Sequence, residues 1–140
     1  MNFPFFNRLH LKKLVVPAVG EAGRRAEAML ASLLHELPEL LLAYVAENQG
    51  GNILASYTAS SAYNPHQLSL RQAKLLRTIQ DAVASGAWVG GPLTDTSVIL
   101  EEHLHYLRPL TNEDWHCFLA IRLADANLGL VKDVVRRAAP

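Results

Sequence analysis

Residues 115–137, near the C-terminal end of the chain, constrain the fold most strongly, because a strand pattern passes there into a helix pattern through a very short turn. The first part of this stretch is rich in aromatic and β-branched residues, which suit a pleated and largely buried strand. Asp125 or Asn127 can then cap the first N–H groups of the helix. The apolar face of that helix consists of Leu130, Val131, Val134 and Val135. We therefore expect a core strand covered by the helix that follows it.

Gly129 stands inside the expected helix, where glycine costs about 1 kcal/mol relative to alanine. A close approach of the first helical turn to the sheet would offset this cost, because only a residue without a side chain lets two backbones touch. We therefore predict that Gly129 has a structural role, alongside Asn127 as a cap.

Upstream of this stretch, the apolar spacing predicts alternating helices and strands. The expected elements are a helix over 21–37, strands over 40–47 and 53–60 around a Gly-Gly turn, a helix from 65 to about 85, and two short strands within 96–110. Pro38 ends the first helix, because proline disfavours helical geometry at the residue before it. Strands joined by such short turns run antiparallel. The sequence thus predicts an α+β fold, a sandwich of a five-stranded antiparallel sheet with helices on its faces, in the order α-β-β-α-β-β-β-α.

The overall composition restricts the number of domains, the kinds of partner and the cellular compartment that we expect. A chain of 140 residues suits one domain, and 13 basic against 13 acidic residues give no electrostatic case for nucleic-acid binding. Half of the residues are hydrophobic and 19% are charged, so we expect some apolar surface to meet another chain. A single cysteine, no signal-peptide pattern and no apolar run of membrane length predict a cytoplasmic protein.

The first 19 residues are assigned to an N-terminal arm, and residues 20–140 to the domain. The arm combines three phenylalanines with the basic residues Arg8, Lys12 and Lys13. Such a mixture suits a membrane surface or a partner protein, and the alternative is a flap that lies on its own domain. Three basic residues are too few for firm electrostatic anchoring, which disfavours membrane contact.

No group of residues in the sequence forms a recognisable enzyme, metal or cofactor site. His103 and His105 would share one face of a strand, but the expected pairing places His116 roughly 13 Å away from His105 along the sheet. Cys117 has no evident base partner, and the glycines at 86–91 lack the lysine and the Ser/Thr of a nucleotide-binding loop. We therefore expect no catalytic residue, no metal and no cofactor.

Two motifs resemble the roadblock/dynein light chain family, in particular its bacterial members. The segment Ala-Asp-Ala-Asn-Leu-Gly-Leu-Val-Lys at 124–132 is similar to the strand-to-helix motif that closes the family's domain. The segment Leu-Leu-His-Glu-Leu-Pro-Glu-Leu-Leu-Leu-Ala-Tyr-Val at 33–45 is similar to its leucine-rich helix, Leu-Pro break and following strand. The resemblance covers residues 21–138. This chain departs from the pattern at Gln49-Gly50-Gly51, where many members have Asp-Gly, and at Glu39, where many have glycine.

The resemblance implies a homodimer. In the family, the strand that corresponds to residues 96–101 and the helix before it meet their copies across a two-fold axis. The residues of this chain that would form the interface are Leu68, Leu75, Leu76, Ile79, Val98, Ile99 and Leu100. The element order also leaves one edge of strand 96–101 open, and an open apolar edge invites pairing with another chain.

The resemblance further implies a non-enzymatic adaptor or regulator that binds a small Ras-like GTPase. A basic stripe on the second helix, Arg71, Lys74 and Arg77, is a candidate contact for an acidic partner, and the alternative is a solvated face. Two other functions stay open, a small-molecule-sensing domain and a purely structural self-assembling scaffold.

Overall fold

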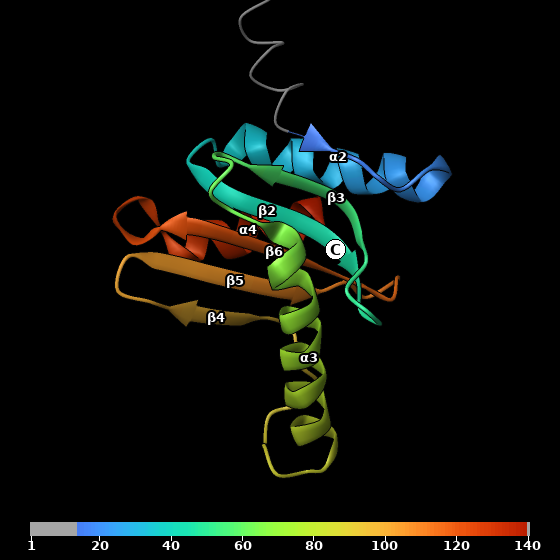
Figure 1. Ribbon diagram of the computed structural model, residues 1–140. Helices are drawn as coiled ribbons and strands as arrows, with labels where there is room; N and C mark the ends of the chain where they lie inside the picture. Colours follow the sequence, from blue (N-terminus) through green and yellow to red (C-terminus); the bar gives the residue numbers. More distant parts are fainter. Residues whose placement is uncertain (1–13, 140) are drawn as a thin grey trace, which may run out of the picture.

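A computed structural model describes residues 14–139, which form one antiparallel sheet with helices on both faces (Figure 1). The strands are β1 (Leu14–Val15), β2 (Leu40–Glu47), β3 (Ile53–Thr58), β4 (Thr96–Ile99), β5 (His103–Pro109) and β6 (Trp115–Arg122). Their order across the sheet is β1-β3-β2-β6-β5-β4. The expected α+β fold and element order are confirmed, but over these residues the sheet has six strands where five were expected.

The added strand, β1, lies inside the predicted N-terminal arm. Leu14 pairs with Tyr57 of β3, and the Ala18 N–H donates to the Leu54 carbonyl at 3.4 Å. Leu14 and Ala18 also pack against the core. A strand of two residues is too short to give a recognisable pattern in the sequence. This segment therefore belongs to the domain, whereas the first 13 residues of the predicted arm lie outside the described residues.

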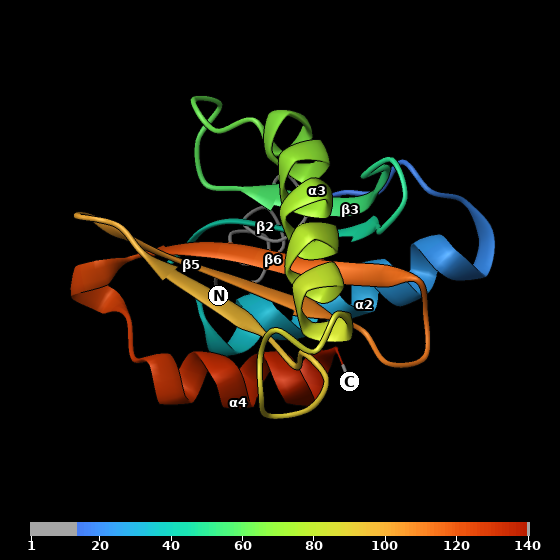
Figure 2. The ribbon, with the colours of Figure 1, turned by 90° about the horizontal axis from the view of Figure 1, so that it is seen from below.

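The helices are α2 (Gly20–Glu36), α3 (Pro65–Ala84) and α4 (Leu128–Ala138), with a 3-10 turn, η1 (Leu123–Asp125), before α4. α2 and α4 cover one face of the sheet, here called the α2/α4 face, and α3 crosses the other, the α3 face (Figures 1 and 2). Because helices cover both faces, the central strands β2 and β6 are buried along almost their whole length. Over the described residues, no helix is long and apolar enough to cross a membrane.

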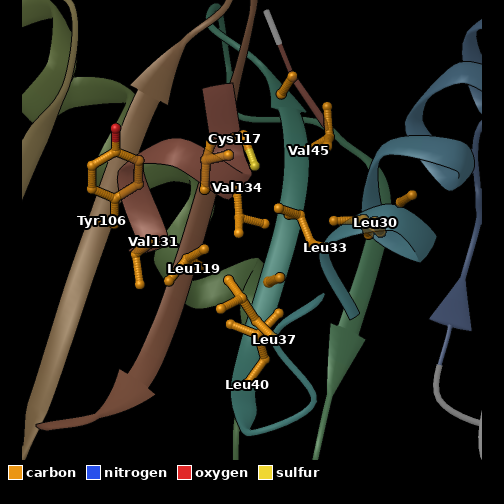
Figure 3. Packing of buried hydrophobic residues seen from close by; sticks show 14 of the residues in the cluster. Leu30, Leu33, Leu37, Leu40, Val45, Tyr106, Cys117, Leu119, Val131 and Val134 are labelled. Carbon is orange, nitrogen blue, oxygen red and sulfur yellow. The ribbon is translucent and has the colours of Figure 1, made fainter. Parts of the chain in front are cut away.

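The larger core lies under the α2/α4 face (Figure 3). Leu30 and Leu33 of α2 pack there with Val45 of β2, Leu119 of β6 and Val134 of α4, and each of these side chains is 0% exposed. The two leucines are three residues apart, so they lie on the same side of the helix. Burial of such side chains stabilises a fold by about 1.5–3 kcal/mol each.

The smaller core lies under the α3 face, where Leu76 packs near Tyr44 and Phe118. The two aromatic rings stack with their centroids 5.3 Å apart. The buried residues of α3 all belong to its first part, and none of residues 77–84 is buried. Figure 1 shows that this C-terminal end of α3 projects beyond the β4 edge of the sheet. α3 is therefore anchored to its own sheet only through its N-terminal part.

Gly129 does not have the predicted role. It is exposed, and a Cβ atom there would meet only the Asn127 Oδ1, at 3.5 Å, which is an ordinary contact. α4 instead meets the sheet through Val131 and Val134, so its glycine faces away from the sheet. A close approach occurs at Gly51, where φ is +67° and a Cβ would lie 2.8 Å from the Ser69 carbonyl oxygen.

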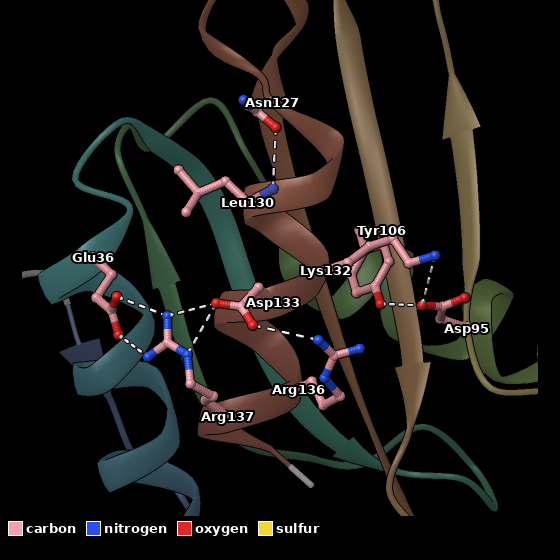
Figure 4. Close-up of polar contacts among 9 residues, drawn as sticks. All are labelled: Glu36, Asp95, Tyr106, Asn127, Leu130, Lys132, Asp133, Arg136 and Arg137. Atoms are coloured by element: carbon pink, nitrogen blue, oxygen red, sulfur yellow. Dashed lines mark hydrogen bonds and ion pairs between the residues drawn. The ribbon is translucent and has the colours of Figure 1, made fainter.

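Two other residues with predicted structural roles stand at the ends of helices. The Asn127 Oδ1 accepts a hydrogen bond from the Leu130 N–H at 3.1 Å (Figure 4). This bond satisfies one of the free N–H groups of the first turn of α4. α2 ends at Glu36, two residues before Pro38, and β2 begins at Leu40.

Candidate dimer interface

β4 leaves one edge of the sheet without a neighbouring strand. It stands last in the strand order, and within residues 14–139 it pairs only with β5. Val98, Ile99 and Leu100 along this edge are 39%, 63% and 45% exposed. The free N–H and C=O groups of an edge strand are a template for another strand, and the apolar side chains favour its burial. The three predicted edge residues therefore lie at an open surface.

The four predicted residues of α3 differ in their exposure. Leu75 is 38% exposed and Ile79 is half-buried. Leu68 is half-buried against the smaller core, and Leu76 is 1% exposed within it. The prediction of Leu76 as an interface residue is wrong, because its side chain belongs to the core of its own chain. Helical spacing identified an apolar face but could not show which of its residues meet the sheet.

α3 and β4 line a shallow groove of about 140 Å³. Leu75 of α3 and Val98 of β4 lie on this groove, together with Leu107, His105 and Phe118 from the neighbouring strands. The His105 ring stands edge-on to the Phe118 ring, with 5.3 Å between centroids, and burial lowers the pKa of His105. The structure thus brings predicted residues of the helix and of the edge strand together on one surface.

The loop that follows α3 carries two further exposed apolar residues, which the sequence analysis missed. Trp88 is 55% exposed and Val89 is 101% exposed. Figure 1 shows their loop at the far end of α3, beyond the β4 edge. The sequence signal that could have identified them is the presence of an aromatic and a β-branched residue inside the glycine-rich segment 86–91.

The buried side chain of His116 is held in a polar network. The Asn48 Nδ2 donates to Asp114 at 3.0 Å, which turns the Asn48 Oδ1 toward the His116 Nδ1–H at 2.9 Å. The other ring nitrogen faces the Tyr44 hydroxyl at 3.3 Å. Burial lowers the pKa of His116 to about 4 and raises the pKa of the neighbouring Cys117 thiol to about 12. Both side chains are therefore uncharged near neutral pH.

The histidines of β5 and β6 are spread along the sheet. His103 and His105 stack on one face, with their ring centroids 6.2 Å apart. His116 pairs with Pro109 across β5 and β6, four residues along the strand from His105. No group of three or more potential metal ligands comes together in the part of the chain that the structure describes.

Ion pairs join the elements of the α2/α4 face (Figure 4). The Arg137 guanidinium lies 2.8 Å from Glu36 of α2 and 3.1 Å from Asp133 of α4. On the same face, the Lys132 ammonium lies 4.0 Å from Asp95, whose carboxylate also accepts the Tyr106 hydroxyl (Figure 4). These contacts bind α4 to α2 and to the segment that leads into β4.

The basic stripe on α3 has no such partners. Arg71, Lys74 and Arg77 are exposed, and within residues 14–139 no carboxylate lies at ion-pair distance from any of them. Their charges face solvent on the helix that borders the open edge. Three uncompensated cations on one helix favour contact with an acidic surface.

Comparisons with known proteins support the fold. No family model matches the chain, and no curated protein matches it. Among solved structures, the Roadblock/LC7 domain from Streptomyces avermitilis matches with a TM-score of 0.65 and 12% sequence identity, over 79% of this chain and 88% of that chain. The chain therefore has the fold of a Roadblock/LC7 domain.

Two bacterial proteins named MglB share this fold. Myxococcus xanthus MglB matches with a TM-score of 0.69 and 11% identity, over 86% of each chain. The gliding protein MglB from Thermus thermophilus matches with a TM-score of 0.67 and 19% identity, over 88% of this chain and 89% of that chain. Both matches span most of the domain.

Proposed function

We propose that the protein is a non-enzymatic homodimeric adaptor of the roadblock type. The open β4 edge supports this proposal most directly, because three neighbouring apolar side chains are exposed there beside unpaired backbone groups. Pairing of β4 with β4 of a second copy across a two-fold axis would join two sheets into one. Such an isologous contact uses up both open edges at once, which leaves a closed dimer.

α3 supplies the second part of the proposed interface. Residues 77–84 at the C-terminal end of α3 include no buried residue, and this end extends past the edge strand, so it can lie over the sheet of a second copy. Leu75, Ile79 and Trp88 would then be covered by the partner. Burial of aromatic and aliphatic side chains of this kind accounts for most of the free energy at dimer interfaces.

The oligomeric state tests this proposal. Light scattering should find a dimer at about 100 μM, far above the Kd of a stable pair. The variant Val98→Lys with Leu100→Glu should be monomeric, because it places charge on the edge that pairs. Val15→Lys is a matched control, since Val15 is 58% exposed on β1 at the opposite edge of the sheet. A monomer at this concentration for the unchanged protein would contradict the proposal.

The proposed partner of the dimer is a small Ras-like GTPase, as in many bacterial roadblock proteins. The basic stripe of Arg71, Lys74 and Arg77 supports an acidic contact surface on that partner. Affinity capture from the native cytoplasm with GTP or GDP analogues should recover a small GTPase in a nucleotide-dependent way. Arg71→Glu with Arg77→Glu should reduce recovery, whereas Arg24→Glu, a charge reversal on α2, should not.

A polar pocket supports a second candidate function, that of a small-molecule sensor. Asn48, Gln49, Arg77, Gln80 and Asp114 converge on a space of about 210 Å³ between α3 and the β2–β3 turn. This volume is below the range of about 300–1,000 Å³ that is usual for ligand sites, so this pocket by itself is small for a metabolite. Mass spectrometry of the purified native protein distinguishes the two, because a retained metabolite would support the sensor.

A further inference from the structure

A histidine, His105, lies in the groove between α3 and the edge strand. It is the register partner of Val98 across β5 and β4, so both side chains lie on the α3 face of the sheet. Leu75 of α3 and Phe118 of β6 line the same groove, and the half-buried His105 ring stands edge-on to the Phe118 ring. His105 is therefore one strand away from the open edge.

The α3 helix of a second copy would cover this groove. An antiparallel pair of two β4 strands has its two-fold axis perpendicular to the sheet, so both copies of α3 lie on the same face. Residues 77–84 of α3 span about 12 Å and project past the β4 edge (Figure 1). Two strand spacings measure about 10 Å. The projecting end of the partner's α3 thus reaches back over β4 and β5 of this chain, where His105 lies.

The carboxylates of the described chain lie away from the His105 ring. Among residues 14–139, none is at ion-pair distance from it. Asp95, just before β4, accepts the Tyr106 hydroxyl on the α2/α4 face. Glu101 and Glu102, in the turn between β4 and β5, line a separate groove.

The other groups around His105 are cationic, titratable to a cation, or uncharged. The His103 ring stacks on it with 6.2 Å between centroids. α3 carries the exposed cations Arg71 and Lys74 beside the uncharged groove residue Gln72, and β6 contributes the Phe118 ring. A positive charge on His105 would therefore gain no opposite charge within the described chain.

The helix end that would cover the groove also presents an apolar side. Leu75, Ile79 and Val83 are four residues apart, so they form one stripe along α3, and Leu75 already lines the groove of its own chain. Residues 77–84 contain one base, Arg77, and one acid, Asp81. Asp81 is two residues from Ile79 and from Val83, which places it on the opposite side of the helix.

We infer that His105 makes the dimer dependent on pH: uncharged His105 is enclosed under the partner's α3, and its protonation opens the dimer. This inference rests on the proposed dimer, and it adds a means of regulating that interface. The physical reason is that a charge on His105 would be buried against apolar side chains without a counter-charge, which is unfavourable.

The direction of the pH dependence follows from linkage. Burial and, to a smaller extent, the charge of His103 already lower the pKa of His105. Further burial by the partner lowers this pKa again, so the proton binds more tightly to the monomer than to the dimer. The dimer is therefore most stable above the pKa that His105 has in the monomer, and it weakens as the pH falls below that value. Because a dimer contains two copies of His105, the Kd rises by up to about 100-fold per pH unit in this range.

Sedimentation of the full-length protein tests the inference. A dilution series with fluorescence detection gives the Kd of the dimer at several pH values, and circular dichroism restricts the comparison to pH values at which the chain is folded. The Kd should be at least about tenfold higher at about pH 5 than at about pH 7.5. An unchanged or lower Kd at the acidic pH would overturn this inference alone. A monomer at about pH 7.5 and 100 μM would contradict the proposed dimer itself.

Substitutions assign the effect to His105. His105→Gln removes the titrating group and should reduce the change in Kd to less than about threefold. His105→Phe should do the same while it keeps a ring against Phe118. His66→Gln is the matched control, since His66 is exposed at the start of α3, far from the projecting end, and this variant should keep the full change. A tenfold rise that persists in both His105 variants would overturn the inference.

Discussion

The two faces of the sheet are covered to different extents. On the α2/α4 face, two helices bury a continuous core, and Arg137 links them through carboxylates of both. On the α3 face, one helix crosses the sheet and none of its residues after Leu76 is buried, next to an edge strand with exposed apolar side chains. The α2/α4 face is thus covered by helices of the same chain, whereas the α3 face keeps exposed apolar surface that a second chain can cover.

The faces also differ in what they bury. The core of the α2/α4 face consists mainly of aliphatic side chains, together with Tyr106, Trp115 and Cys117. On the other side, Tyr44 joins the smaller core and faces the buried ring of His116. Every buried polar side-chain atom among the described residues has a hydrogen-bond partner. A buried polar network of this kind is stable only while each group keeps the protonation state that its partners require.

The largest expected effect is a difference in the free energy of unfolding between a variant of the α2/α4 face and a variant of the α3 face. Leu33→Ala should lower the free energy of unfolding by about 2–5 kcal/mol, because it opens a cavity under α2. Leu75→Ala should change it by less than about 0.5 kcal/mol when measured in the monomeric edge variant, since its side chain then faces solvent. Urea unfolding of both variants checks this prediction. Equal losses would show that α3 is packed as firmly as α2.

The next effect is a pH dependence specific to the α3 face. The pKa of His116 is about 4 in the folded protein, against 6.5 for an unperturbed histidine, so the unfolded chain binds the proton first as the pH falls. Stability from His116 is therefore complete above about pH 6.5, and about 3 kcal/mol is lost as the pH falls to 4. Urea unfolding at several pH values should show this slope, and His116→Phe should reduce it. His35→Gln, at an exposed histidine, is the control and should keep the slope.

The smallest effect contrasts two glycines. Gly51→Ala should lower the free energy of unfolding by about 1–3 kcal/mol, because its φ is +67° and the new Cβ would press on the backbone of α3. Gly129→Ala should raise it by about 0.5–1 kcal/mol, since alanine favours a helix and meets no tight contact there. Thermal melts distinguish the two. A loss at Gly129 would mean that α4 approaches a neighbour more closely than the structure shows.

Much of the fold could be predicted from local patterns. The strand-to-helix passage at residues 115–137, the break at Pro38 and the Gly-Gly hairpin each depend on neighbours in the sequence, and the element order follows from them. The open edge also follows from this order, because β4 has only β5 beside it in the chain. Periodicity and turn residues are short-range signals, so they are readable without coordinates.

Long-range packing decided the rest. Leu75 and Leu76 are equally apolar, yet one is exposed and the other is buried, because only the crossing of α3 over the sheet determines which side of the helix meets β2 and β6. The same holds for Gly51 and Gly129, since close backbone approach depends on an element distant in sequence. By itself, the sequence determined which segments become strands and helices and in what order. The tertiary structure alone decided which faces they bury and which surface is left for a partner, because burial is a property of contacts between distant segments.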